Sequence, residues 1–285
     1  MTITSNERQA KTAPSAYALG ASADAARRLE VQDAQFAAIS ERLLDRLCLQ
    51  TSDRVVELGI GAGSFSRRIL RRLGGGGSLI GVDKTQGLLD QVAQYVQGIS
   101  DARVELMLGD ISDLQAWLAS ADVVVGRTVL HHLAFPEVLL GKLRGGLPSG
   151  ARVGFIEPEF RALLGRLARL ENNGRTELAV FRRWAEGISR YYQACGLAPA
   201  IGATLERTLE EAGYEDVVGE WFECPMDAGG IENMLLYYDE IRDRYESLGI
   251  MTAAEIERDK RLLASLDTRD VPAVWGMYCV TCRQP

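Results

Sequence analysis

Val55-Val56-Glu57-Leu58-Gly59-Ile60-Gly61-Ala62-Gly63-Ser64-Phe65-Ser66 is the stretch from which the fold of this chain is predicted. Two β-branched residues and an acid lead into three glycines at alternate positions, and a helical apolar spacing follows at Phe65, Ile69 and Leu73. This order predicts a strand, a tight turn and a helix. Glycines let the backbone come close to a ligand, and the start of a helix offers unpaired N–H groups. The stretch therefore predicts a ligand site where the strand ends.

A second acid follows at the distance expected for a nucleoside site. Twenty residues after Gly63, an apolar run ends in Asp83, and an acid at the tip of the second strand commonly holds a ribose diol. A helix cap is the plainer interpretation of Asp83. The glycine spacing is G-x-G-x-G, with Ser64 where the last glycine of the dinucleotide pattern G-x-G-x-x-G stands. The pair predicts a nucleoside-containing cofactor and disfavours a nicotinamide dehydrogenase.

The centre of the chain alternates between strand and helix patterns. Five β-then-α units predict an α/β fold with a parallel sheet and right-handed crossovers. Ligands of such sheets bind beyond the carboxyl ends of the strands. The predicted strands are 54–59, 78–83, 104–108, 122–126 and 152–156, and the predicted helices lie near 63–73, 85–97, 112–119 and 135–146.

The flanking regions predict further segments around this core. Aromatic residues gather in the second half, at Phe181, Trp184, Tyr191, Tyr192, Tyr237 and Tyr238. They predict either the packed interior of a helical cap or an apolar pocket for an organic molecule. The predicted segments are a disordered tail (1–13), an N-terminal helical lid (14–50), the ligand-binding core (51–160), a helical cap segment (161–213) and the last two strands (214–285) with a helical insertion at 229–270.

The composition bounds the class of protein. The 285 residues carry a net charge of −7, which lacks the basic footprint of a nucleic-acid-binding protein. No apolar run approaches the roughly 20 residues of a membrane span, and the first residues lack a signal-peptide pattern. We expect a cytoplasmic monomer or homodimer with no nucleic-acid or membrane partner. Cys279 and Cys282 lie three apart in a predicted strand, so they point to opposite faces and no metal site is expected.

The pattern E-L-G-x-G-x-G at Glu57–Gly63, followed by Val82-Asp83, resembles motifs I and II of the class I S-adenosylmethionine (SAM) dependent methyltransferases. The lead-in Tyr17-Ala-Leu-Gly20, with Arg28-Leu29 and Gln32, is similar to that of small-molecule methyltransferases of the ubiquinone/menaquinone-biosynthesis type. The resemblance covers most of the chain and weakens across 160–270. It implies a Rossmann-like fold with a seven-stranded, mostly parallel sheet, an antiparallel last strand and a helical cap, and it implies SAM as the cofactor.

The resemblance also implies roles for residues at the sheet edge. The glycines and Glu57 shape the pocket for the methionine portion, Asp83 accepts from both ribose hydroxyls, and an acid after the third strand accepts from the adenine amino group. Two plainer interpretations stay open, in which Asp110 caps the next helix and Arg127 pairs with Glu157. The implied cofactor-binding residues are Tyr17, Glu57, Gly59, Gly61, Gly63, Asp83, Lys84, Asp110, Ile111 and Arg127, with Thr128 beside the methyl group.

Methyl transfer from a sulfonium is an in-line displacement that needs alignment, exclusion of water and, for oxygen or nitrogen acceptors, removal of a proton. His131 and His132, the only histidines of the chain, follow the fourth strand and are candidate bases, with packing as the alternative. Glu157 and Glu159, beyond the fifth strand, are rival bases. Tyr17 is a candidate lid residue that covers the cofactor. The predicted catalytic residues are His131, Tyr17 and Glu157.

The sequence therefore predicts a SAM-dependent methyltransferase that acts on a small organic molecule, in specialised metabolism. One alternative is another SAM-using reaction on the same fold: intramolecular cyclisation or elimination of SAM, or a pericyclic step. A second alternative, from another class, is a non-catalytic binding subunit. The nature of the products separates these, because methyl transfer yields S-adenosylhomocysteine (SAH) and attack on the methionine chain yields methylthioadenosine.

Overall fold

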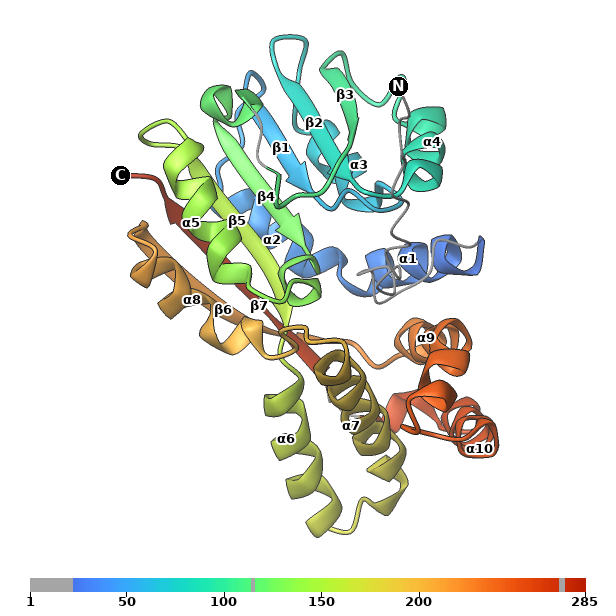
Figure 1. The fold of residues 1–285 in the computed structure, drawn as a ribbon. Helices are drawn as coiled ribbons and strands as arrows, with labels where there is room; N and C mark the ends of the chain where they lie inside the picture. The colour runs from blue at the N-terminus through green and yellow to red at the C-terminus, as the bar shows by residue number, and fades with distance from the viewer. Residues whose placement is uncertain (1–22, 114–115, 272–274) are drawn as a thin grey trace, which may run out of the picture.

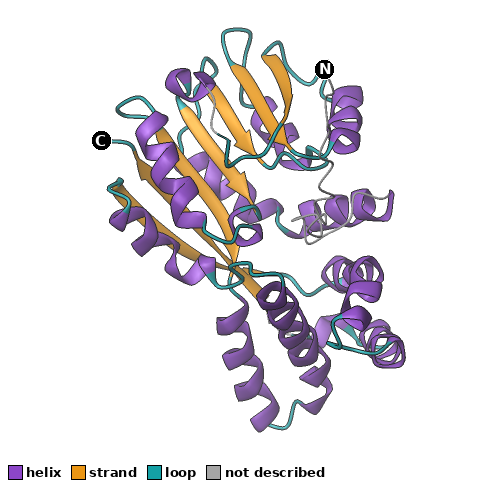
Figure 2. Ribbon diagram, viewed as in Figure 1, coloured by secondary structure: helices purple, strands orange, loops and turns teal. Residues whose placement is uncertain are grey.

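The computed structural model describes residues 23–113, 116–271 and 275–285. Figures 1 and 2 show a sheet flanked by helices and, beyond one end of it, a purely helical region. The strand order is β3-β2-β1-β4-β5-β7-β6; β1 to β5 are parallel, and β7 is antiparallel to both neighbours. This confirms the predicted fold. The strands are β1 (Arg54–Leu58), β2 (Ser78–Asp83), β3 (Arg103–Leu108), β4 (Val123–Arg127), β5 (Arg152–Pro158), β6 (Glu215–Cys224) and β7 (Trp275–Arg283).

β1 lies where the chain order of the sheet reverses. It pairs with β2 on one side and with β4 on the other, and Leu58 stands opposite both Val82 and Gly126. All of its residues after Arg54 are buried, as expected for a parallel strand covered on both faces. The chain leaves neighbouring strands in opposite directions here, so a crevice opens beyond the carboxyl ends of β1 and β4.

Helices cover both faces of this sheet. Apolar side chains of α2, α3 and α4 form one core cluster with the strands, and those of α5 and α8 form the other. Cys279 and Cys282 of β7 are buried in different clusters, which confirms that they point to opposite faces. The bounds are α2 (Ala37–Arg46), α3 (Ser64–Leu70), α4 (Gln86–Tyr95), α5 (Pro136–Gly146) and α8 (Ile201–Glu211).

α8 corrects one predicted boundary. It falls within the predicted cap segment 161–213, yet Ile201, Leu205 and Leu209 are buried in the same cluster as Val153 of β5 and Val280 of β7. Apolar residues four apart give α8 one apolar face, and this face covers the sheet. The rest of the predicted division into segments stays a prediction. The helices of the cap are α6 (Phe160–Asn172), α7 (Ala179–Ala194), α9 (Ala228–Ser247) and α10 (Ala253–Ala264), the last two between β6 and β7.

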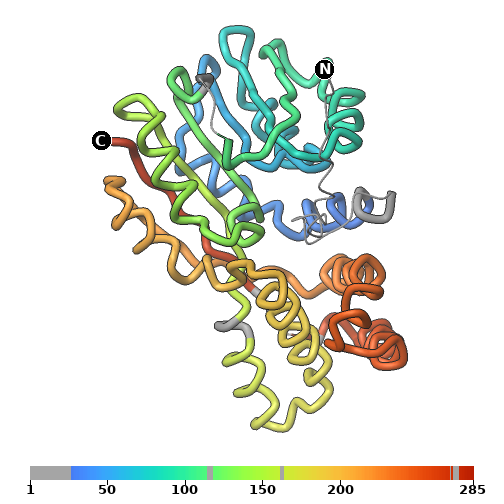
Figure 3. The backbone as a smooth tube through the Cα atoms, viewed as in Figure 1, coloured from blue at the N-terminus to red at the C-terminus, as the bar shows by residue number. Residues whose placement is uncertain are grey.

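α1 (Ala23–Gln35) lies between the sheet and the cap, as the blue segment of Figure 3 shows. It packs against α9, where Arg28 Nε donates to Glu240 Oε2 at 2.6 Å and both side chains are almost fully buried. Asn233 Nδ2 of α9 donates to Gln35 Oε1 at 2.9 Å. α1 also contacts α3 of the core, so it joins the two halves of the molecule.

Short 3-10 helices complete the described chain. One of them, η1, stands in the second half of the segment where a helix is predicted near 112–119. Within the described ranges, no helix has both the length and the apolar character needed to cross a membrane. The 3-10 helices are η1 (Ala116–Ser120), η2 (Leu130–His132), η3 (Thr176–Leu178) and η4 (Thr268–Asp270).

Candidate active site

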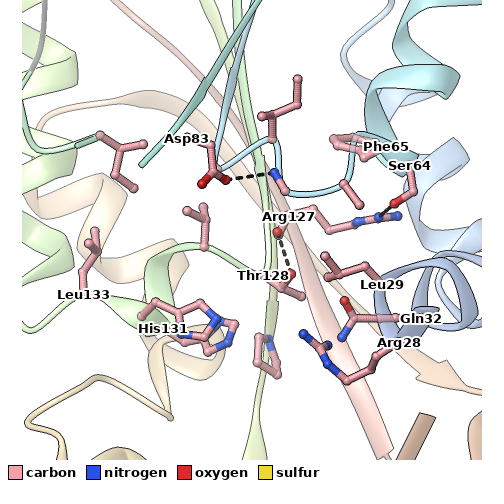
Figure 4. Close-up of a pocket in the computed structure, with 18 of the residues that line it drawn as sticks. Arg28, Leu29, Gln32, Ser64, Phe65, Asp83, Arg127, Thr128, His131 and Leu133 are labelled. Atoms are coloured by element: carbon pink, nitrogen blue, oxygen red, sulfur yellow. Dashed lines mark hydrogen bonds between the residues drawn. The ribbon is translucent and has the colours of Figure 1, made fainter. Parts of the chain in front are cut away.

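A cavity begins at the carboxyl ends of β1, β2 and β4 and extends under the cap (Figure 4). It holds about 1240 Å³ of empty space, part of it open to solvent. Residues of the core, of α1 and of the cap all contribute to its wall. The structure brings these sequence-predicted residues together on that wall: Glu57, Gly59, Gly61, Asp83, Lys84, Asp110, Ile111, Arg127, Thr128, His131 and His132.

The three motif glycines share a positive φ, but Gly61 and Gly63 have different surroundings. All have positive φ, of +66° at Gly59, +55° at Gly61 and +72° at Gly63, a region that disfavours side chains. A Cβ on Gly63 would lie 2.1 Å from the Tyr95 hydroxyl oxygen, so packing of α3 against α4 requires this glycine. The nearest atom to a Cβ on Gly61 would be Leu29 Cδ1, at 3.7 Å. Gly61 therefore presents open backbone to the cavity, whereas Gly63 lies outside its wall.

Asp83 and Asp110 hold backbone groups and face the cavity at the same time. Asp83 Oδ2 accepts from the Gly61 N–H at 3.0 Å, drawn in Figure 4, and its Oδ1 accepts from the Thr85 N–H at 2.9 Å. Asp110 Oδ1 accepts from the Ser112 N–H at 2.8 Å. Each carboxylate oxygen has a second lone pair. The capping bonds therefore leave both acids able to accept from a ligand.

Glu57 is a buried acid on the wall of the cavity. Its side chain is 2% exposed, and Ser66 Oγ donates to its Oε2 at 2.6 Å. Burial raises the pKa of Glu57 to about 8, and the Ser66 hydrogen bond and the charge of Arg127 only partly oppose this. A bound cation beside it would favour the ionised form.

Arg127, at the end of β4, pairs with Asp33 of α1. Its Nη1 donates to Asp33 Oδ1 at 2.6 Å and to Ser40 Oγ at 3.0 Å, and its Nη2 donates to Ser64 Oγ at 2.8 Å. Burial lowers the pKa of Arg127, and the charge of Asp33 opposes this shift. The interpretation in which Arg127 pairs with Glu157 is wrong, because Glu157 accepts from other donors.

The groups that donate to Glu157 lie in η2 and at Val129, the residue just before it. Glu157 Oε1 accepts from the N–H groups of Val129 at 2.8 Å and Leu130 at 2.7 Å, and Oε2 lies 2.7 Å from His131 Nδ1. Thr128, just before, has a φ of +55°, which turns the backbone so that these groups converge. Glu157 is fully buried outside the cavity wall, whereas His131 lines the cavity. A proton held on Nδ1 by the carboxylate leaves Nε2 as the acceptor nitrogen.

The remaining candidate bases are placed differently. Burial lowers the pKa of His132 well below its ordinary value, and the charges of His131 and Arg28 add to this shift. Glu159 is 2% exposed and its Oε2 accepts from the Ala203 N–H at 3.2 Å, at the start of α8, away from the cavity wall. Tyr17 lies outside the described residues, so its proposed place over the cofactor stays a prediction.

The cap and α1 supply the rest of the cavity wall. Three residues of the predicted aromatic cluster, Trp184, Tyr192 and Tyr237, line the cavity, whereas the others are buried away from it. Asn233 lies four residues before Tyr237, and a polar residue on the apolar face of a helix was the signal that could have identified it. The other wall residues not foreseen as site residues are Arg28, Leu29, Gln32, Ile60, Ala62, Ser64, Phe65, Gly109, Val129, Leu133, Pro158, Phe160 and Ile188.

These residues fit a nucleoside that carries an amino acid. Gly61 leaves room against bare backbone, Asp83 offers oxygen acceptors at the tip of β2, and Glu57 is a buried acid suited to an ammonium group. In the described ranges, no group of three or more His, Cys, Asp or Glu side chains is arranged to hold a metal ion.

Parts of the chain are similar to known proteins. Residues 55–146 match a protein family described as "Methyltransferase domain". An "uncharacterized 37.1 kDa protein in transposon TN4556" of Streptomyces fradiae is 29% identical over 172 residues, which are 60% of this chain and 46% of that protein. The aklanonic acid methyltransferase DauC of Streptomyces sp. (strain C5) is 25% identical over 182 residues, 57% of this chain and 83% of that protein. The chain thus matches less than half the length of the first of these relatives.

Solved structures share the fold. The cyclopropane synthase MmaA2 of Mycobacterium tuberculosis has a TM-score of 0.61 and 16% identity, covering 96% of this chain and 100% of that one. The [4+2]-cyclase SpnF has a TM-score of 0.55 and 18% identity, covering 87% and 80%. Phosphoethanolamine N-methyltransferase 2 of Haemonchus contortus, solved with SAM, has a TM-score of 0.57 and 15% identity, covering 90% and 56%. The matched domain, the fold and the glycine and aspartate motifs agree: residues 55–146 match a methyltransferase domain, and the chain shares the fold of solved SAM-dependent methyltransferases.

Proposed function

We propose that this protein transfers a methyl group from SAM to a small organic acceptor bound under the cap. The observation that carries the proposal is one cavity whose wall includes both the glycine bend with Asp83 and the histidine of the His131–Glu157 pair. The methyltransferase-domain match and the relative named as an aklanonic acid methyltransferase support it.

The cofactor-binding part of the proposal follows from the wall around β1 and β2. Asp83 accepts from the ribose hydroxyls, Asp110 and the backbone of Ile111 bind the adenine, and Glu57 accepts from the ammonium group. Gly61 lets the ligand approach the backbone. When bound, SAM supplies an electrophilic methyl group for in-line displacement.

The acceptor-binding part follows from η2 and the cap. His131 Nε2 takes the proton of the attacking group, while Glu157 keeps Nδ1 protonated and the ring oriented. Trp184 and Tyr192 exclude water from this part of the cavity. Glu157 is therefore a positioning residue in this proposal, and His131 is the catalytic one.

The test of the function is product analysis on the purified full chain. SAM is incubated with a panel of phenols, aryl amines and keto acids, and the nucleoside product is identified by mass spectrometry. SAH together with a methylated acceptor is the expected result. Methylthioadenosine would point instead to a reaction within SAM, and a failure to bind SAM in calorimetry would point to a non-catalytic subunit.

The assignment of the base is tested with matched histidine variants. His131→Gln is expected to lower kcat by about 10²- to 10⁴-fold, the usual contribution of a general base, with SAH affinity within about twofold. His132→Gln is the control and is expected to change kcat far less, because the lowered pKa of His132 makes its ring a weaker base. Glu157→Gln is expected to lower kcat with SAH affinity unchanged, because the ring of His131 loses the carboxylate that orients it. An unchanged kcat in His131→Gln would remove the base from the mechanism.

A further inference from the structure

Thr128, the residue after β4, has a backbone conformation that threonine rarely adopts. Its φ of +55° lies in the left-handed region, which is strained for a β-branched residue and easily reached by glycine. Main-chain groups make the hydrogen bonds that hold this turn: the Thr128 N–H donates to the Ile156 carbonyl at 2.8 Å, and the next two N–H groups donate to Glu157. Glycine could hold the same turn without strain. The backbone therefore does not account for a threonine at this position.

The side chain of Thr128 faces the space for a ligand. Thr128 is half-buried and lines the cavity, and in the view of Figure 4 it lies between His131 and the side chains of α1. Its Oγ1 donates to the Arg127 carbonyl oxygen at 2.7 Å, so the hydroxyl proton is already used. Among the described residues, no group donates to Oγ1. Because a hydroxyl oxygen has two lone pairs, Thr128 offers the cavity an acceptor and no donor.

The charges on the cavity wall favour a cation. Arg28 and Arg127 line the cavity, and each is paired with an acid. Asp83 and Asp110 accept only from backbone N–H groups within the described ranges. Lys84 is the remaining lysine or arginine of the wall, and the two aspartates outweigh its single charge. The wall therefore presents a negative potential to a ligand.

The sulfonium end of SAM is the cationic group that fits beside Thr128. With the ribose at Asp83 and the ammonium group at Glu57, the sulfur that joins these two parts of SAM lies beyond the ends of β1 and β4. Thr128 follows Gly126 by two residues, and Gly126 pairs with Leu58 at the end of β1. A sulfonium places positive charge on the hydrogens of its methyl group, and polarised C–H groups contact oxygen lone pairs.

We propose that Thr128 Oγ1 contacts the positively charged sulfonium end of SAM and thereby distinguishes SAM from SAH, the uncharged thioether that remains after methyl transfer. This inference rests on the placement of SAM in the proposed function and adds a residue that recognises the charge of the cofactor. The contact directs the methyl group toward the space lined by His131. Once the methyl group has left, the neutral sulfur no longer attracts the oxygen, so this contact does not retain the product.

Three ligands with the same nucleoside and the same amino acid end test the inference. They are SAM; sinefungin, which has a charged amine in place of the S-methyl group; and SAH. Each is titrated calorimetrically into the full wild-type chain and into Thr128→Val, which keeps the shape of the side chain without its hydroxyl. We expect Thr128→Val to weaken SAM and sinefungin about fivefold or more, with SAH affinity within about twofold. Thr128→Ser keeps the hydroxyl and should leave all three affinities within about twofold.

Two further variants separate the hydroxyl from the fold of the turn. Thr128→Gly lacks Oγ1 but suits a positive φ, so its melting temperature should equal or exceed that of the wild type while SAM and sinefungin still bind more weakly. Thr208→Val is the matched control, because Thr208 Oγ1 also donates to a carbonyl, that of Thr204 at 2.8 Å, but lies on α8 outside the cavity wall. It should leave all three affinities unchanged.

The outcomes separate this inference from the function on which it rests. Equal losses for SAM and SAH in the Thr128 variants, or unchanged affinities for SAM and sinefungin, would overturn the role of Thr128 while the binding of SAM stands. Thr128→Gly decides the case even if Thr128→Val does not fold. Methylthioadenosine as the product of the wild-type chain would overturn methyl transfer without touching this contact. Absence of SAM binding by the wild-type chain would overturn both.

Discussion

Asp33 Oδ1 on α1 lies 2.6 Å from Arg127 Nη1 at the end of β4, although 94 residues separate the two in the chain. Asp33 Oδ2 also accepts from Arg68 Nη2 of α3, at 2.8 Å. Although burial acts to raise it, the pKa of Asp33 is held below its ordinary value by Arg68 and Arg127. The acid thus binds α1 to the wall of the cavity through two cations.

Removing Asp33 is therefore expected to cost both stability and ligand affinity. Asp33→Ala leaves the buried guanidinium of Arg127 without its charge partner, a change that costs about 3 kcal/mol in unfolding free energy by urea titration. SAH affinity is expected to fall at least fivefold, because α1 loses its anchor beside the site. Glu105→Ala, which breaks the exposed pair with Arg103, is the control and should cost less than about 0.5 kcal/mol. Equal effects of the two changes would contradict the anchoring role.

The raised pKa of Glu57 leads us to expect that its carboxyl releases a proton when the ligand binds. With a pKa of about 8, its carboxyl is mostly protonated at pH 7, and an ammonium beside it favours the ionised form. Calorimetry of SAH binding at pH 7 in buffers of different ionisation enthalpy should show release of close to one proton. Methylthioadenosine, which lacks the amino acid tail, and the Glu57→Gln variant with SAH should release none. A full proton released by methylthioadenosine would assign the effect to another group.

The same carboxyl predicts a dependence of stability on pH. Its pKa is about 8 in the folded chain and near its ordinary value of 4.5 when unfolded, so the folded state binds more protons between these values. Its contribution to stability therefore falls as pH rises from about 4.5 to about 8. Unfolding free energies of the wild type relative to Glu57→Gln should decline over this range. A constant difference would contradict the raised pKa.

Gly61 and Gly63 are expected to fail in different ways when replaced by alanine. Gly63→Ala places Cβ against the Tyr95 hydroxyl at a positive φ, and should lower the unfolding free energy by about 3 kcal/mol. Adding Tyr95→Phe should restore part of this loss, because the obstructing oxygen is removed. Gly61→Ala should cost only about 1 kcal/mol for its φ, yet weaken SAH binding at least tenfold by filling the space of the ligand. Wild-type SAH affinity in Gly61→Ala would place the ligand elsewhere.

Asp83→Ala is expected to weaken SAH binding at least tenfold, about 1.4 kcal/mol. The reason is the loss of the ribose acceptor, together with the bond that fixes the Gly61 N–H. Asp113→Ala, on the exposed segment after β3, serves as the control. Unchanged affinity by titration would refute the ribose assignment.

The sheet and the position of Gly61 and Asp83 on the cavity wall could be predicted because both depend on short-range patterns. A strand, a glycine bend and an acid after the next strand fix Gly61 and Asp83 at one edge once the sheet is parallel. The part of the cavity wall under the cap depends on contacts between helices that are far apart in the sequence. Arg28 meets Glu240 across 212 residues of chain. No periodicity predicts such a pair, because it follows from how α1 and α9 pack.

The pairing of His131 with Glu157 shows a second limit of the sequence. His131 and Glu157 could be identified as chemically suitable, but their sequence positions suggest rivals rather than partners. The pairing follows from the left-handed backbone of Thr128, which directs three N–H groups and a ring nitrogen at one carboxylate. A β-branched residue rarely adopts that conformation, so the local sequence does not predict it.

The antiparallel strand β7 has a consequence for how the sequence of this protein could diversify. β6 reaches the sheet only through β7, and β7 is held by β5 in a ladder in which Tyr278 stands opposite Glu157. The helices α9 and α10 lie in the segment between β6 and β7, and these two strands pair with each other. Residues can be added or exchanged in this segment without shifting the strand register that places Glu157. The wall of the cavity under the cap can therefore change in evolution while the His131–Glu157 pair keeps its geometry.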